Sequence, residues 1–339
     1  DGKKLFSSQI EFKQYFPKNG WVEHNPNEIW LKTLKVIKNV GNKCKKNKIK
    51  IITIGITNQR ETTVLWDKTN GKPVYNAIVW QDRRTENYCK KIKNKENLIR
   101  KKTGLFIDPY FSATKIKWVL DNVTKAKKLL KKNLLLFGTI DSFLIWKLTG
   151  GKLHATDATN ASRTMLFNLN KNKWDHDILK IFKIKKNILP VVKNSADNFG
   201  FTSKKILGEK ISISAVLGDQ QAAVVGQGCF EKGSVKSTYG TGAFVIMNTG
   251  NKKLTSKNRL LSTICYRINN KTTYALEGSI FIAGAGVQWL RDKIKLINNA
   301  YETEKIARSK KNNQDIYLVP DTTCLGTLYG SLNSHKIII

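Results

Sequence analysis

Apolar and polar positions along this chain follow two different periods, which predicts a mixed α/β protein. An Ile-rich run over residues 50–57 predicts a buried strand. Apolar residues at helical spacing from Ile29 to Val40 predict a helix that Asn27 caps. Further helices are predicted over residues 85–99, 114–121, 142–148 and 284–298, with Gly150 and Gly151 ending the helix over 142–148.

Short apolar runs predict the other strands. Residues 63–79 are typical of a hairpin, and Asn70-Gly71 indicates a type I′ turn. The remaining strands are predicted over residues 10–16, 233–238, 243–248, 260–267, 272–276 and 316–320. We expect one α/β domain over residues 1–227 and a second over 228–339, which ends before its sheet is complete.

Two glycine-containing turns indicate a chemistry. In Gly218-Asp219-Gln220-Gln221, an apolar strand pattern ends and a small-residue helix pattern begins, so Asp219 lies where a carboxylate can take a proton from an attacking hydroxyl. Residues 237–242 contain a Gly-Thr-Gly turn, in which backbone N–H groups can approach phosphate oxygens without interference from a Cβ. Together the turns predict phosphoryl transfer to an alcohol.

The charge balance raises a nucleic-acid alternative. The chain has 339 residues and a formal net charge of +35, but only nine of its 60 basic residues are Arg. Heavy use of Lys, Asn and Ile at surface positions is typical of proteins from an AT-rich genome. Specific recognition of phosphates or bases favours Arg instead, because its side chain can donate two hydrogen bonds at once. We therefore expect no specific nucleic-acid binding, and only salt-sensitive adhesion to polyanions.

Composition also indicates a compartment. Five scattered cysteines fit neither a disulfide framework nor a zinc site, and no apolar run is long enough to span a membrane. Both observations predict a cytoplasmic protein without a membrane partner. The four histidines are dispersed, which argues against a His-based metal site or catalytic triad.

Several side chains suit a polyol. Arg60 and Glu61 follow the Ile-rich strand and offer fixed donors beside an acceptor carboxylate, although spacing alone favours a structural salt bridge in a loop at the strand end. Trp80 ends an apolar run, Tyr110 follows a turn, and Phe244 lies two residues after the Gly-Thr-Gly turn. Each of these aromatic residues either contacts a ligand or belongs to the core.

Longer runs resemble the glycerol kinases of the FGGY carbohydrate-kinase family, and they occur in the family's order. They extend from about residue 10 to residue 320 and comprise residues 20–24, 55–63, 75–81, 110–118, 159–164, 218–221 and 237–242. The kinases of xylulose, ribulose and gluconate differ at the Asn-Gln-Arg-Glu-Thr segment, residues 58–62, so that segment indicates glycerol.

The resemblance implies two actin-like, ribonuclease H-like domains that close over ATP and glycerol, in a homo-oligomer. It implies that Asp219 is the catalytic base, that positioning and charge carry the transfer, and that Mg²⁺ binds chiefly through phosphate oxygens and water. No side chain is assigned to the metal. The implied glycerol site comprises Arg60, Glu61, Trp80, Tyr110, Asp219, Gln220 and Phe244, and the implied nucleotide site comprises Gly240, Thr241, Gly242, Gly284 and Gln288.

The chain also departs from the family. The family's N-terminal phosphate hairpin (Asp-x-Gly-Thr) and its C-terminal adenosine-binding segment have no counterpart, and residues 206–210 lack the Arg with which some members bind a sugar bisphosphate regulator. A second hypothesis is therefore a non-catalytic remnant that binds glycerol or associates with other subunits. A basic nucleic-acid-binding protein is the third.

Overall fold

The computed structural model describes residues 2–240, 242–280, 283–312, 318–319 and 337–338. The chain forms two compact units. The first comprises Asp1–Ala222 and Thr263–Thr273, and the second comprises Ala223–Ser262 and Tyr274–Ile339. The chain therefore returns to the first unit after it has entered the second, which no pattern in the sequence indicated. Strands and helices are mixed along the chain, as the predicted α/β class requires.

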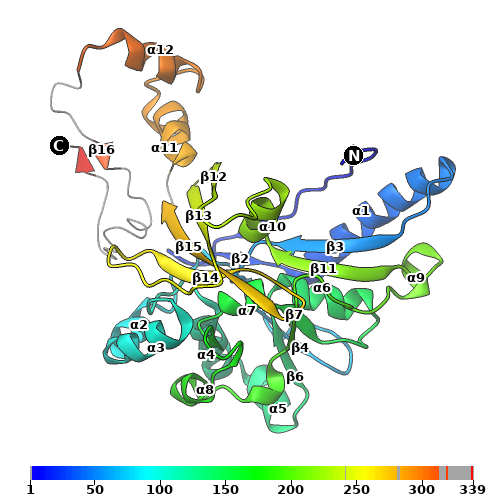
Figure 1. The fold of residues 1–339 in the computed structure, drawn as a ribbon. Coiled ribbons are helices and arrows are strands. Elements are labelled where there is room, and N and C mark those ends of the chain that lie inside the picture. The colour runs from blue at the N-terminus through cyan, green and yellow to red at the C-terminus, as the bar shows by residue number, and fades with distance from the viewer. Residues whose placement is uncertain (1, 241, 281–282, 313–317, 320–336, 339) are drawn as a thin grey trace. The chain divides into compact units, whose positions relative to one another are not determined.

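In the first unit, short strands alternate with helices (Figure 1). The strands are β1 (Gln14–Tyr15), β2 (Glu23–His24), β3 (Thr53–Asn58), β4 (Val64–Asp67), β5 (Ala77–Ile78), β6 (Leu135–Gly138), β7 (Ala155–Asp157), β8 (Phe167–Asn168), β9 (Lys173–Trp174), β10 (Val191–Lys193) and β11 (Ser212–Gly218). The helices are α1 (Pro26–Lys46), α2 (Glu86–Lys91), α3 (Glu96–Thr103), α4 (Ser112–Asn122), α5 (Thr124–Lys131), α6 (Ile140–Leu148), α7 (Ala158–Ser162), α8 (His176–Phe182) and α9 (Lys204–Leu207), while α10 (Asp219–Gly226) crosses into the second unit.

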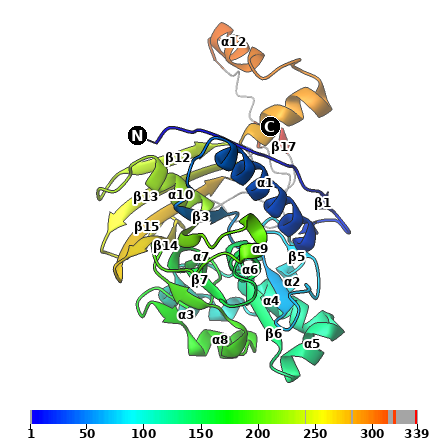
Figure 2. The ribbon, with the colours of Figure 1, turned by 90° about the vertical axis from the view of Figure 1, so that its right-hand side faces the viewer.

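Parallel pairing joins strands that are far apart in sequence. β3 pairs with β11, and β7 pairs with β10, both in parallel. β4 pairs with β6 and β2 with β5 in the antiparallel sense. α1 and α9 lie next to each other (Figure 2), and a Cβ on Gly41 would lie 2.5 Å from Leu207 Cδ2, so glycine allows this close packing.

The sequence determines where α1 begins. Asn25 caps the helix by accepting hydrogen bonds from the backbone N–H groups of Asn27 and Glu28, and Pro26 is the first helical residue. The prediction that Asn27 is the cap is wrong, because Pro26 already has the φ angle of a helix and lacks only an N–H that the first turn does not use. The predicted helices over 114–121 and 142–148 are confirmed as α4 and α6.

The hairpin over residues 63–79 forms, but its turn differs from the predicted one. Asp67 N–H donates to Lys72 O, and the Asp67 carboxylate accepts from the Thr69 N–H at 2.8 Å and from Asn70 Nδ2 at 3.2 Å. Of the two central residues only Gly71 has a positive φ, whereas a type I′ turn needs both. The Asp67 side chain therefore organises a longer loop.

Three other predicted elements are shorter or broken. The helix over 85–99 divides at Ile92 into α2 and, after a 3₁₀ turn at Lys93–Lys95, α3. The helix over 284–298 ends as α11 (Gly284–Trp289) and continues only as a π turn at Leu290–Ile294. The strand over 10–16 is reduced to β1. Local spacing predicted each of these elements, but contacts with the rest of the fold determine where each one ends.

Most of the next sheet belongs to the second unit, although residues 263–273 of its last two strands belong to the first. β12 (Val235–Tyr239) pairs with β13 (Ala243–Gly250), which pairs with β15 (Lys271–Ile280), and β14 (Leu261–Ile268) follows β15 in the sheet order. The chain passes between the two units within β14 and β15. The unit also contains α11, α12 (Glu302–Ser309) and the pair β16 (Leu318–Val319) and β17 (Ile337–Ile338). The predicted strand over 316–320 lies mostly outside the described residues.

A buried polar cluster lies at the carboxyl ends of β3, β6 and β7. Asp141 accepts hydrogen bonds from Thr139 Oγ1 at 2.5 Å, Thr156 Oγ1 at 2.7 Å and Asn58 Nδ2 at 3.4 Å. Burial raises the pKa of Asp141 to about 7, and the Coulombic effect of nearby Asp157 adds to this increase. Burial also raises the pKa of Asp157. The cluster fixes the loops that follow these strands.

Asp141→Asn should reduce the loss of stability that occurs as the pH rises from about 5 to about 7. Folded Asp141 keeps its proton to about pH 7, whereas an unfolded aspartate loses it near 4, so the folded state binds more protons in between. The contribution of Asp141 is thus present at low pH and is lost as the pH rises through 7. Urea unfolding should show that wild type loses more stability than Asp141→Asn across this interval, by on the order of 1–3 kcal/mol.

The matched control is Asp121→Asn, which removes a half-exposed carboxylate from α4. It should follow the wild-type pH dependence. Equal pH dependence in wild type and Asp141→Asn would show that Asp141 does not titrate differently in the folded state.

Candidate active site

The site is built where two parallel strands end side by side. In the β3–β11 register Asn58 is opposite Gly218, so the loop that carries Arg60 and the start of α10 leave the sheet at the same level. Arg60 Nε lies 3.5 Å from Asp219 Oδ1. Arg60 is 2% exposed, while the Asp219 side chain is 43% exposed. A buried guanidinium thus holds one side of a carboxylate whose other side is open.

Glycine at position 218 makes this approach possible. A Cβ on Gly218 would lie 2.6 Å from Arg60 Cγ and 2.7 Å from Arg60 Cδ, which is closer than real Cβ contacts. The Gly218 N–H donates to Thr159 Oγ1 at 2.9 Å, which fixes the end of β11. The next residues also hold the arrangement: Gln220 N–H donates to Asp219 Oδ1, and Gln221 Oε1 accepts from Arg60 Nη1 at 3.2 Å.

Glu61 has an unusual backbone conformation. Its φ is +60°, and the Thr62 N–H donates to Arg60 O at 2.7 Å across it. For a residue other than glycine such a turn is uncommon and costs energy. The Glu61 carbonyl accepts from Ser112 Oγ and from Thr63 Oγ1, each at 3.0 Å. These hydrogen bonds hold the Glu61 carboxylate beside Arg60, at 3.8 Å from its Nε.

Arg163 connects Glu61 to the aromatic residues. Its Nε donates to Glu61 Oε1 at 2.6 Å, and its guanidinium lies 5.4 Å from the centre of the Tyr110 ring. The Trp80 and Tyr110 rings meet edge to face with centroids 5.7 Å apart. The Tyr110 N–H donates to Asp108 Oδ1 at 2.8 Å. The first unit therefore brings together Arg60, Glu61 and Asp219 directly, with Trp80 and Tyr110 joined to them through Arg163.

The predicted residues of the second unit lie on two neighbouring elements. Phe244 is near the start of β13, opposite Thr238 of β12 and Ser279 of β15. Gly240 lies in the turn before β13, where its N–H donates to Gly242 O at 2.8 Å and its carbonyl accepts from the Gly284 N–H at 2.9 Å. Gln288 lies on α11, which Gly284 begins. Thr241 lies outside the described residues.

Sequence reasoning gave no role to several residues that hold this site. Arg163 belongs to a run, residues 159–164, that resembles the family, yet no spacing rule indicates that it contacts Glu61, 102 positions earlier. Arg84 is a second example. Its buried guanidinium pairs with Glu23 at 2.7 Å and Asp82 at 2.8 Å and lies 3.8 Å from the centre of the Trp21 ring. Asp82 also accepts from the Val22 N–H, which fixes the turn that carries Trp80.

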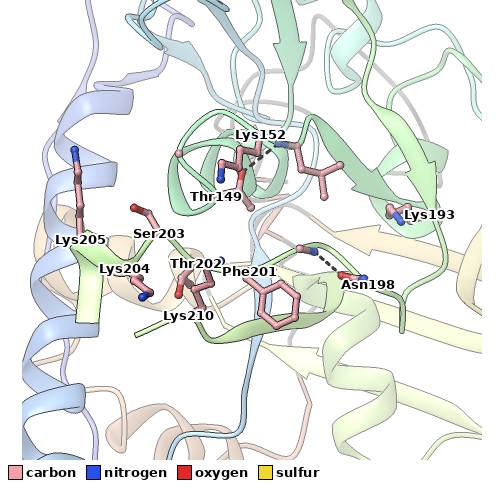
Figure 3. A pocket seen from close by; sticks show the side chains of 13 residues that line it. Thr149, Lys152, Lys193, Asn198, Phe201, Thr202, Ser203, Lys204, Lys205 and Lys210 are labelled. Carbon is pink, nitrogen blue, oxygen red and sulfur yellow. Dashed lines mark hydrogen bonds between the residues drawn. The ribbon is translucent and has the colours of Figure 1, made fainter. Parts of the chain in front are cut away.

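A separate cavity contains none of the predicted site residues (Figure 3). Its volume is about 650 Å³, and its lining includes Lys152, Lys193, Lys204, Lys205 and Lys210. Of these lysines, Lys193 pairs with Asp197 at 3.4 Å. This basic cavity does not carry the chemistry predicted for Asp219.

Two features of the described part of the chain bear on cofactors and membranes. Within those ranges, no group of three or more His, Cys, Asp or Glu side chains could hold a metal ion. Among the helices that the structure describes, none is long and apolar enough to cross a bilayer.

Comparison with known sequences identifies the relatives of this chain. Residues 1–226 match the N-terminal domain of the FGGY family of carbohydrate kinases. The chain is 57% identical over 335 residues to a glycerol kinase of Alteromonas mediterranea, covering 98% of this chain and 68% of the relative. It is 52% identical to a glycerol kinase of Coxiella burnetii, covering 99% of this chain and 68% of the relative. The chain thus spans about two thirds of the length of these relatives.

Solved structures agree with the sequence comparisons. The structure of Plasmodium falciparum glycerol kinase with ADP is 40% identical and superposes with a TM-score of 0.89, covering 97% of this chain and 67% of that one. A gluconate kinase from Lactobacillus acidophilus is 20% identical with a TM-score of 0.85, covering 100% of this chain and 68% of that one, and it shows the shared fold alone. The fold, the matched domain and the identity to these relatives establish that this chain belongs to the FGGY family of carbohydrate kinases.

Proposed function

We propose that this protein transfers the γ-phosphate of ATP to a terminal hydroxyl of glycerol, giving sn-glycerol 3-phosphate and ADP. The observation that carries the proposal is the meeting of Arg60 and Asp219 at the paired ends of β3 and β11. Relatives that are 52–57% identical over nearly the whole chain are named glycerol kinases, which supports glycerol as the substrate.

Recognition of the polyol is assigned to groups with complementary hydrogen bonding. Arg60 offers donors only, and the Glu61 carboxylate offers acceptors only, so together they suit adjacent hydroxyl groups that both donate and accept. Trp80 and Tyr110 supply apolar ring surface for the carbon skeleton, and Gln220 supplies an amide at the start of α10. A site built to pair with hydroxyl groups rejects ligands that leave its buried polar groups unpaired.

Asp219 is the proposed catalytic base. Its carboxylate accepts the proton of the attacking hydroxyl while that oxygen forms a bond to the γ-phosphorus and the bond from phosphorus to the bridging oxygen of ADP breaks. Arg60, at 3.5 Å, keeps Asp219 oriented without covering it. Since phosphoryl transfer requires little covalent participation from the protein, the orientation of Asp219 is its main contribution.

Nucleotide binding is assigned to the second unit. The backbone amides of Gly240 and Gly242, with Thr241, would hold the β- and γ-phosphates, and Gly284 and Gln288 would lie on the nucleotide side. The hydrogen bond from Gly284 to Gly240 joins these two elements, and the Plasmodium falciparum glycerol kinase was solved with ADP, which supports ATP as the donor. Phe244 is assigned to the glycerol.

We propose that Mg²⁺ binds only together with ATP. The described residues contain no cluster of carboxylates or histidines suited to hold the ion by themselves, so we assign its ligands to phosphate oxygens and water and derive no step through it. A homo-oligomer, a cytoplasmic location and a domain division at 227/228 complete the proposal.

The proposed function predicts substrate selectivity. With ATP and Mg²⁺, the protein should phosphorylate glycerol and leave xylulose and gluconate unchanged, because the Arg60–Glu61 pair suits a short polyol. A coupled ADP assay measures all three. Binding of glycerol without turnover would favour the non-catalytic remnant, and salt-sensitive binding of DNA without glycerol binding would favour the nucleic-acid alternative.

Asp219→Asn should separate chemistry from binding. The amide keeps the shape of the side chain but cannot accept the proton, so kcat should fall by about 10²–10⁴-fold while glycerol affinity changes little. Steady-state kinetics and calorimetry measure the two quantities. Asp177→Asn, at an exposed carboxylate on α8, is the control and should retain the wild-type rate. A near-native rate in Asp219→Asn would remove this residue from the role of base.

Gly218→Ala should weaken glycerol binding through Arg60. The added methyl group would lie 2.6 Å from Arg60 Cγ, so the guanidinium must move away from Asp219 and Gln221. We expect KM for glycerol to rise by about tenfold or more, as the loss of a hydrogen bond from a charged group would produce. Gly226→Ala, at the end of α10 where a Cβ meets nothing within 4 Å, should be neutral. Equal kinetics for the two variants would contradict the packing argument.

A further inference from the structure

Lys115 is a lysine without solvent exposure. It lies on α4 and is 0% exposed, although most of the chain's basic residues are on the surface. Its Nζ donates to the backbone carbonyl of Tyr110 at 2.5 Å. Within the described residues, no carboxylate lies within 4.0 Å of this ammonium. Burying a cation in this way costs several kcal/mol, whereas a methionine would fill the same volume without that cost.

The carbonyl that Lys115 holds belongs to a proposed substrate residue. Tyr110 is fixed from both sides of its backbone, since its N–H donates to Asp108 Oδ1 at 2.8 Å and its C=O accepts from Lys115. The Tyr110 ring then meets Trp80 at 5.7 Å. A change in the charge or identity of Lys115 therefore affects the Trp80–Tyr110 pair through the Tyr110 carbonyl.

The charges around Lys115 come from several elements. Glu61 lies after β3, Asp82 before α2, Asp108 in the turn before α4, and the Cys89 thiol on α2. Burial lowers the pKa of Lys115 to about 8, and these groups oppose the effect. Burial raises the pKa of Cys89 to about 12, so its thiol does not titrate in the same range.

We propose that Lys115 is a positioning residue for the polyol: its ammonium fixes the Tyr110 carbonyl and thereby the orientation of the Trp80–Tyr110 pair. The statement about the polyol rests on the proposed glycerol function, whereas the orientation of the two rings can be measured without any substrate.

The first test uses the ligand-free protein. The emission of Trp80 is obtained as the difference between the protein and its Trp80→Phe variant, each recorded from about pH 6.5 to 9.5. We expect a transition near pH 8, as Lys115 loses its proton, and we expect it to be absent when Lys115→Met is introduced into both members of the pair. Lys117→Met, on the same helix with its Nζ paired to Asp121, is the matched control and should keep the transition.

The second test is kinetic. Lys115→Met should raise KM for glycerol by about ten- to hundredfold with a much smaller change in kcat, the range expected for a lost hydrogen bond from a charged group. In the unmodified protein, KM should rise as the pH passes above 8, and in Lys115→Met this dependence should disappear. A merely structural role would lower the amount of active protein and leave KM and its pH dependence unchanged.

The two tests separate the two proposals. A Lys115-dependent emission transition in a protein that does not phosphorylate glycerol would support the positioning role and overturn the glycerol function. Glycerol turnover with no emission transition near pH 8, or with a transition that Lys115→Met retains, would overturn the positioning role. If Lys115→Met does not fold, the titration of the unmodified protein and of Lys117→Met still decides: no transition, or one that Lys117→Met removes, overturns the proposal.

Discussion

The parallel pairing of β3 with β11 is the constraint on which the site depends. Asn58 at the end of β3 lies opposite Gly218 at the end of β11. Arg60 follows two residues after Asn58, and Asp219 follows directly after Gly218. A slip of one residue in this register would turn alternate side chains to the other face of the sheet and would separate Arg60 from Asp219. The pairing also explains the glycine at 218, because the aliphatic part of Arg60 occupies the space of its absent side chain.

Charge compensation around Glu61 is the second requirement. Its carboxylate is almost fully buried, and two buried guanidinium groups, of Arg60 and Arg163, face it. Burying such groups is costly, and close, charge-assisted hydrogen bonds such as the 2.6 Å contact of Arg163 offset the cost. The left-handed backbone conformation of Glu61 adds strain, and hydrogen bonds from Ser112 and Thr63 to its carbonyl maintain that conformation. The arrangement favours a fixed geometry over maximal stability, as expected of a site that positions its substrate.

The sequence predicted this site in its parts and missed its connections. An apolar strand followed by Asn-Gln-Arg-Glu, and another followed by Gly-Asp, were visible from local patterns. That the two strands pair in parallel, and that Arg163 reaches Glu61, depends on contacts between residues more than 100 positions apart, which no local pattern contains. Local patterns also failed where a side chain formed competing hydrogen bonds. The Asp67 carboxylate organises a longer loop in place of the type I′ turn that Asn70-Gly71 predicted. The salt-bridge interpretation of Arg60 and Glu61 and the substrate interpretation are compatible, because the ion pairs of Glu61 with Arg60 and Arg163 help to hold the acceptor in place.

Burial distinguishes the basic residues that a compositional bias explains from those that the fold requires. A bias toward lysine acts on exposed positions, where a change among polar residues costs little, and it accounts for basic surfaces such as the cavity around Lys152 and Lys204. The same bias cannot account for Lys115, since burying an ammonium group lowers stability unless hydrogen bonds or opposite charges offset the cost. Net charge therefore indicates little about function in this chain, whereas a buried basic residue such as Lys115 points to a specific structural requirement. The carbonyl that this residue holds belongs to the loop that carries Tyr110, which places the requirement at the proposed substrate site.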